Sequence, residues 1–195
     1  MMYIGKIVSS SSHVDYLCQV YGPGEAEVGP QPEDYGFGAF VGVEGAHGGH
    51  LVGAIYNTAL LSPEFGNLGP RLSAREELAV FSPDYLAEKA TLVAVAILGA
   101  VAANGTVHQG VPAMAASIDD RVRRLRVEEI IAFHALETGL RLGYLPTLTA
   151  LRTHLAVQLM LQIIASLSVL FPQEAQRLAI LSNNLDWRAR VEPVG

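Results

Sequence analysis

The chain has 195 residues, of which half are hydrophobic and 16% are charged, and its formal net charge is −6 at neutral pH. A chain of this length and apolar composition can bury a sizeable core, and the composition excludes an intrinsically disordered protein. Residues 1–110 have a net charge of −7 and residues 111–195 a net charge of +1. Because phosphates would be repelled, the acidic first half argues against broad nucleic-acid binding there.

Cysteine usage and the N-terminus indicate the cellular compartment. The single cysteine, Cys18, cannot form an internal disulfide, and its place in an apolar segment predicts a buried thiol. The first ten residues, MMYIGKIVSS, lack the apolar run of a secretory signal. We therefore expect a cytoplasmic protein.

Short apolar segments separated by Gly, Pro and Ser dominate residues 1–110. Such segments are typical of β-strands, and the glycines within them favour tightly curved strands over a flat sheet. The sequence thus predicts a small closed barrel. The expected strands are Tyr3–Ser9, His13–Tyr21, Phe37–Val43, Leu51–Leu60, Thr91–Ala102 and, after an Asn104-Gly105 hairpin turn, Thr106–Gly110.

Residues 62–89 interrupt this series. Ser73 and Glu76 have the spacing of a capping box, and Ser82-Pro83 offers a second helix start. Two short helices are expected, Ala74–Phe81 and Pro83–Lys89, as an insertion at about residues 73–89.

The segment from Ser117 to Arg126 has two interpretations. Ile118, Val122 and Leu125 have helical spacing, whereas Arg121–Arg126 could instead form a last strand before a helix starting near Val127. Local pattern favours the helix. The family resemblance described below favours the strand, which is the interpretation adopted.

The remaining residues are expected to be helical. The predicted helices are Val127–Thr138, Thr147–Phe171 and a last one from Pro172, with Leu178, Leu181 and Leu185 on one side. In the long helix, His154, Gln158, Gln162 and Ser166 form a narrow polar stripe. Leu155–Phe171 has no charge, but it is shorter than a membrane span and contains polar residues. We expect it to be buried in a bundle or in an oligomer interface formed by Leu155, Leu159, Ile163 and Leu170.

Taken together, these elements resemble a HAS barrel, the six-stranded barrel at the N-terminus of HerA-type DNA translocases and of the ring subunits of rotary ATP synthases. The resemblance covers about residues 1–134. It rests on the order and spacing of Ile4–Val8 before the serine turn, Gly38–Val43 with Leu51–Ile55, Ala94–Gly99 with Asn104-Gly105 and Val111-Pro112, and Arg121–Phe133. The implied fold is a HAS-type barrel over residues 1–126 and a C-terminal helical hairpin or bundle over 127–195.

The chain departs from those ATPases in lacking their phosphate-binding loop. No G-x-x-x-x-G-K-[ST] string occurs, and this pattern is what cradles the phosphates and reaches magnesium. The resemblance therefore implies the barrel's assembly role without motor activity. In HerA-type systems, the implied partner resembles the NurA nuclease.

Arg121, Arg123, Arg124 and Arg126 form a basic cluster that could hold phosphate or a nucleic-acid strand. Acidic residues flank the cluster and no aromatic residue interleaves it, so ion pairing within the chain or between subunits is favoured.

Histidines offer two further candidates. His47 and His50 flank Gly48-Gly49 and could bind a metal with Glu44, although a solvated hairpin tip is favoured. His134 and Glu137 are helical neighbours, for which a surface helix face is favoured over acid–base chemistry. No catalytic, cofactor-binding or metal-binding residue is assigned.

Three functions follow. The first is a non-enzymatic adaptor that self-associates and docks a partner, for which the resemblance implies a HerA-like ATPase or NurA-like nuclease. The second is a single-stranded nucleic-acid-binding barrel, for which Arg123→Glu with Arg124→Glu should abolish binding. The third is a small-molecule-binding barrel or enzyme with a deep pocket lined by His13, His47 or His50.

Overall fold

A computed structural model of the chain describes residues 1–26, 28–45, 48–61, 90–137, 139–151 and 153–191. The predicted two-helix insertion at residues 73–89 lies outside these residues. Seven strands form the main antiparallel sheet, and these are β1 (Tyr3–Ser12), β2 (Asp15–Val20), β3 (Phe40–Glu44), β4 (His50–Leu61), β5 (Ala90–Val101), β6 (Val107–Gln109) and β7 (Arg121–Arg124).

Six of these strands close into a barrel, as the sequence predicts. The strand order is β2-β1-β7-β3-β4-β5, and β2 pairs with β5 to complete the circle. The short β6 extends β5 beyond the barrel as a hairpin, with Gly105 at the predicted turn. Arg121–Arg124 is a strand between β1 and β3, which decides between the two interpretations of this segment.

Side chains fill the barrel interior. β5 alternates strictly, with Val93, Val95 and Ile97 inside and fully buried. At Gly5 in β1, a Cβ would collide with the carbonyl of Gln19 on β2, so the glycine permits the close approach of these strands. Cys18 also faces this core, and burial raises the pKa of its thiol to about 12, which makes it an inert packing residue, as expected.

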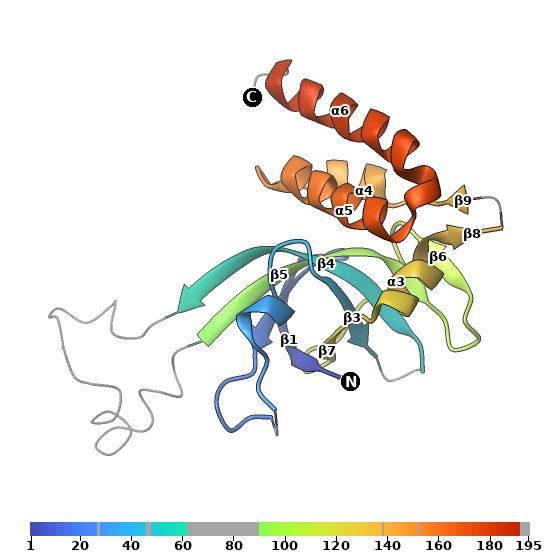
Figure 1. The fold of residues 1–195 in the computed structure, drawn as a ribbon. Coiled ribbons are helices and arrows are strands. Elements are labelled where there is room, and N and C mark those ends of the chain that lie inside the picture. Colours follow the sequence, from blue (N-terminus) through green and yellow to red (C-terminus); the bar gives the residue numbers. More distant parts are fainter. Residues whose placement is uncertain (27, 46–47, 62–89, 138, 152, 192–195) are drawn as a thin grey trace, which may run out of the picture.

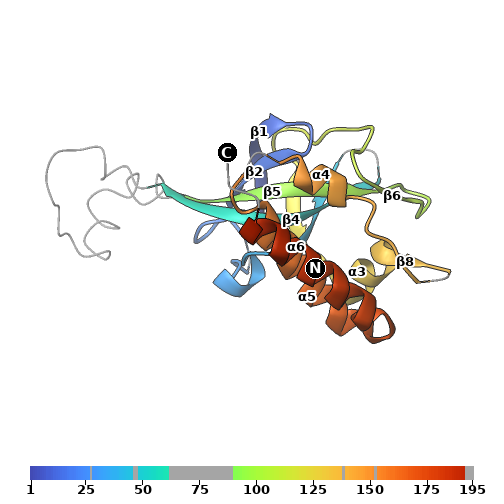
Figure 2. The same ribbon diagram turned by 90° about the horizontal axis from the view of Figure 1, so that it is seen from above.

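Helices cover one outer face of the barrel. The elements that follow β7 are α3 (Val127–His134), a small hairpin of β8 (Ala135–Leu136) and β9 (Gly139–Leu140), α4 (Leu145–Thr149), α5 (Ala156–Leu170) and α6 (Ala175–Val191). Two 3-10 turns, η1 (Pro32–Asp34) and η3 (Pro172–Glu174), complete the described elements. In Figure 1 the layers are the barrel, then α4 and α5, then α6 as the outermost helix. Figure 2 shows α5 and α6 crossing β4 and β5 diagonally.

A second hydrophobic core, separate from the barrel interior, lies between the outer face of the barrel and the helices. Outward residues of the sheet such as Phe40 and Leu98 pack in the same cluster as Leu159 and Ile163 of α5. Gly38, with φ +79°, lies directly beneath Gln162 of α5, where an added Cβ would collide with the Gln162 side chain. The barrel face and its helical cover are thus one packed body.

Two predicted helices differ from the structure. The helix expected over Thr147–Phe171 is two helices, because the chain turns between Thr149 and Ala156, where Thr153 accepts the amide of Leu155 with its hydroxyl (3.2 Å). The helix expected over Val127–Thr138 ends at His134, where the β8–β9 hairpin begins. The last helix agrees with the prediction, with Leu178, Leu181 and Leu185 packed on the core.

Candidate functional site

Arg123, in β7, is held by two carboxylates on the outer surface of the barrel. Its guanidinium donates to both Glu129 oxygens (2.9 and 2.8 Å) and through Nε to Glu44 (2.9 Å). Only 4% of Arg123 is exposed. Since Glu44 ends β3 and Glu129 lies in the first turn of α3, this arginine ties α3 to the barrel.

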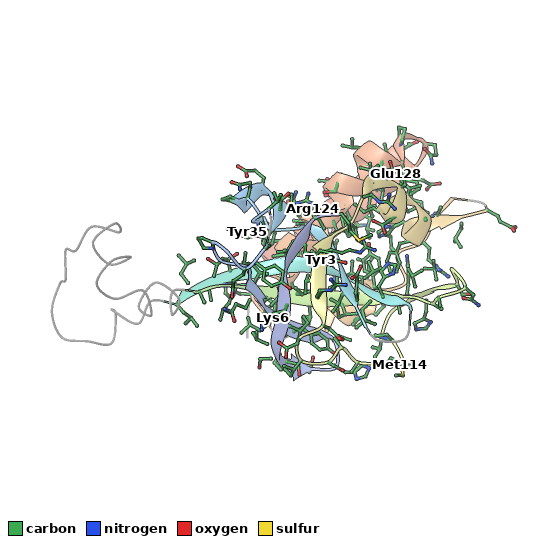
Figure 3. The ribbon with its side chains drawn as sticks, turned by 90° about the horizontal axis from the view of Figure 1, so that it is seen from below. Tyr3, Lys6, Tyr35, Met114, Arg124 and Glu128 are labelled. Atoms are coloured by element: carbon green, nitrogen blue, oxygen red, sulfur yellow. The ribbon has the colours of Figure 1, made fainter. Side chains whose placement is uncertain are left out.

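The other three arginines also have partners within the chain. Arg121 lies 4.4 Å from the centre of the Tyr3 ring and contacts Glu44 at 3.4 Å. Arg124 donates to the backbone carbonyls of Glu33 and Asp34, and Arg126 contacts Glu129 at 3.4 Å. Figure 3, a view from the side opposite α5 and α6, shows Tyr3 of β1 and Arg124 of the neighbouring strand β7, with Glu128 farther away on α3. The cluster is therefore an intramolecular network rather than four free cations.

The network is electrostatically coupled. Burial by itself would raise the pKa of Glu129, but hydrogen bonds from Arg123 and from the Arg126 backbone and side chain outweigh it and lower that pKa to about 2. Burial opposes the charge of Arg123, and the two carboxylates more than compensate, which raises the pKa of the guanidinium. Arg123→Glu would place a third carboxylate here, so loss of nucleic-acid binding in the double variant named above could not be distinguished from loss of folding.

His134 is not a surface acid–base residue. Its ring is fully buried, with one nitrogen 2.7 Å from the Ile130 carbonyl and the other 2.9 Å from the Tyr144 hydroxyl. Burial lowers the pKa of His134 to about 4. Glu137 lies beyond the helix end and is exposed, so the predicted His134–Glu137 pairing along one helix is wrong.

The predicted oligomer interface is only partly available. Leu159 and Ile163 are fully buried in the chain's own core beneath α5, while Leu155 and Leu170 are partly buried. For these two residues the alternative of burial within the chain is correct and the oligomer-interface prediction is wrong, because this side of α5 packs on the barrel. Within the described residues, no helix combines the length and hydropathy needed to cross a bilayer.

A pocket of about 430 Å³ lies at the barrel end where β3 stops and β4 begins. His50 contributes to its wall. The His13 ring hydrogen-bonds to the carbonyl of Pro112, a residue of the pocket lining (2.8 Å). His47 lies outside the described residues. Since the barrel interior is filled, the pocket belongs to the mouth and does not extend down the barrel axis. Among the described residues, no three His, Cys, Asp or Glu side chains are grouped closely enough to hold a metal ion.

Comparison with known protein families gives one match. The family described as "Domain of unknown function (DUF8166)" matches residues 1–194, nearly the whole chain. The chain belongs to this family. No curated protein matches the sequence. This DUF8166 domain thus includes both the barrel and its helical cover.

Sequence reasoning missed two residues that complete these sites in the DUF8166 chain. Tyr3 stacks on Arg121 and donates to Glu44 (2.8 Å), although it is 118 positions away from that arginine in the sequence. Tyr144 pairs with His134 across the β8–β9 hairpin. Glu129 is one of the acidic residues that flank the arginine cluster in the sequence, and its pairing with Arg123 agrees with the ion pairing favoured there.

Proposed function

We propose that this chain is a non-enzymatic assembly module that self-associates through the outer side of α6 and docks a partner protein. The resemblance to HAS barrels suggests a partner of the HerA-type ATPase or NurA-type nuclease class, and hence a role in DNA processing. The observation that carries the proposal is an exposed apolar stripe on α6.

This stripe consists of Ile180, Trp187 and Val191, which are 59%, 64% and 54% exposed. With Asn184 they have the spacing i, i+4, i+7 and i+11, which places them on one side of a helix. The opposite side packs inward through Leu178 (2% exposed). Large apolar side chains gathered on the outermost helix are typical of a helix-packing interface between proteins.

A groove of about 400 Å³ lies beside the stripe. It is formed by Ile180, Leu181 and Asn184 of α6 together with Leu140, Leu142 and Leu145 from the β9–α4 region. A second helix laid along α6 could place its own apolar side chains in this groove, which supports association through α6 rather than through α5.

The test of self-association is light scattering after size-exclusion chromatography on the full chain at several concentrations. We expect a defined oligomer for the wild type and monomers for Ile180→Glu and Trp187→Glu. Val169→Glu is the matched control, since Val169 is 80% exposed on α5 and does not belong to the stripe. A monomeric wild type, or an oligomer that both stripe variants leave intact, would contradict this interface.

Partner docking is tested separately with purified HerA-type ATPase and NurA-type nuclease of the same organism. Biolayer interferometry should detect binding of one of them to the full chain. Absence of binding to both, with the oligomer intact, would remove the DNA-processing assignment while leaving the assembly role in place.

A further inference from the structure

The barrel-mouth pocket has the construction of a ligand site that is formed before binding. Its floor consists of buried Val43 and Leu51 at the top of the barrel interior. Eight of its eighteen lining residues are alanine or glycine, so much of the wall consists of backbone and methyl groups. Small side chains at these positions leave the space empty.

The segment Pro112–Ser117 forms one wall and is fixed at three places. The Pro112 carbonyl contacts the His13 ring (2.8 Å), the Ala116 amide donates to the Tyr16 hydroxyl (3.1 Å), and the Ser117 amide donates to Asp120 (2.8 Å). Between these anchors Met114 is 62% exposed and appears at the outer edge of the molecule in Figure 3. A fixed frame with one adaptable thioether at its rim suits a ligand of compact apolar shape.

The pocket lining includes one carboxylate, that of Asp120. Asp120 is the only Asp, Glu, Lys or Arg among the lining residues. Its neighbour Asp119 is paired with Lys6 (3.0 Å), but within the described part of the chain no cation pairs with Asp120. Burial, followed by the nearby Arg123, lowers the pKa of His50, which is therefore neutral at pH 7 and does not offset this negative charge.

We propose that the barrel mouth binds a compact apolar ligand carrying a positive charge, such as a primary amine attached to an aromatic ring. The ring would displace water from the alanine, valine and leucine walls, and the ammonium group would pair with Asp120. This site is independent of α6, so its test is separate from that of the assembly role.

Matched probes separate the charge from the apolar body. Phenethylamine and 3-phenylpropionate have similar shape and opposite charge, and each is titrated into the isotopically labelled full chain and followed by NMR. We expect the amine to shift amides of residues 100–103 and 113–120 with a Kd of about 0.1–1 mM, a range typical of so small a ligand. The carboxylate should bind at least about tenfold more weakly, since one unfavourable charge contact readily exceeds the 1.4 kcal/mol that this ratio requires.

Two variants with matched controls assign the site. Asp120→Asn keeps an oxygen for the Ser117 amide and should weaken amine binding at least about fivefold, whereas Asp119→Asn, outside the pocket, should not. At Gly45 an added Cβ would meet only the Asp120 carboxylate, at 3.8 Å, so Gly45→Leu should obstruct the pocket. Gly29 has nothing within 4 Å of such a Cβ, and Gly29→Leu is the control.

The source of the amine is distinguished with a third probe. A Phe-Ala-Ala tripeptide amide presents the same ring and ammonium group at a peptide N-terminus. Tighter binding of the tripeptide than of phenethylamine would assign the site to a peptide, and the reverse to a free amine. Equal binding of the phenylpropionate, unchanged affinity in Asp120→Asn, or amide shifts confined to other parts of the chain would each overturn the proposal.

Discussion

At residue 123 a guanidinium is removed from water and surrounded by carboxylates from two different elements. Such a triad adds little to stability over well-packed apolar residues, but removing its centre leaves two carboxylates close together without their cation. Arg123 therefore has a structural role within the arginine cluster. Arg126, whose side chain is 69% accessible, is instead an exposed charge of the same cluster.

Replacing Arg123 with methionine should lower the free energy of unfolding by about 3 kcal/mol, because Glu44 and Glu129 would lose the buried cation they share and keep only their contacts with the exposed Arg121 and Arg126. Denaturant titration measures the change. Arg121→Met is the control and should cost less than about 1 kcal/mol, since 58% of that side chain is exposed. Equal losses in the two variants would contradict the central place of Arg123.

His134 should make the fold sensitive to mild acid. The folded-state pKa is about 4 against 6.5 in the unfolded chain, so only the unfolded state takes up a proton as the pH falls from 6.5 to 4. Unfolding is thereby favoured, by up to about 3 kcal/mol at the lower limit. Glu129, with its pKa near 2, contributes its own loss only below about pH 4.5.

His134→Gln tests this assignment. Glutamine can hydrogen-bond to the Tyr144 hydroxyl but does not titrate, so the variant should show a shallower fall in unfolding free energy between pH 6.5 and 4.5 than the wild type. Parallel pH profiles for the two proteins would show that other groups cause the dependence.

Among the elements, strands were easier to predict than helix ends. The apolar run Thr91–Ala102 and the Asn104-Gly105 turn are local signals, and both agree with the structure. The turn between α4 and α5 has no comparable marker, because no glycine or proline lies between Thr149 and Ala156. It is imposed by packing, since Leu148 and Leu159 both bury against the barrel face.

Position 38 tests how closely α5 is seated on the barrel. Gly38→Ala should destabilise the fold by at least about 1–2 kcal/mol, from the positive φ alone. The collision with Gln162 adds to this cost, so combining the variant with Gln162→Ala should recover part of the loss in a double-mutant cycle. Simple additivity of the two changes would argue against the contact.

For the whole molecule, the shared core limits how the chain can be divided. The sequence predicts a barrel followed by a separate helical region. If the two parts were separable, removing the helices would test their role in assembly. Outward residues of the sheet such as Phe40 and Leu98 lie under the helices. The periodicity of apolar residues within a strand does not show which outward residues a helix will cover. The candidate sites were equally hidden, since Tyr3 and Arg121 come together only through the pairing of β1 with β7.

A chain ending at Thr138 should therefore not behave as a soluble barrel. Exposing the face beneath α4 and α5 creates a large apolar patch, and we expect aggregation or strong binding of the dye ANS. Solubility and dye fluorescence of this truncated chain measure the outcome. A soluble, dye-negative fragment would show that the barrel is stable without its helical cover.

Closure of the barrel also sets the order in which a newly made chain can fold. β1 pairs with β7, so the first strand must wait for residue 124 to leave the ribosome. The helices that shield the sheet end at Val191, some 67 residues later. At about 5–20 residues per second, a nascent barrel would leave this side uncovered by its helices for roughly 3–13 seconds. During that interval the chain is a natural client for chaperones, even though the finished molecule conceals the same surface.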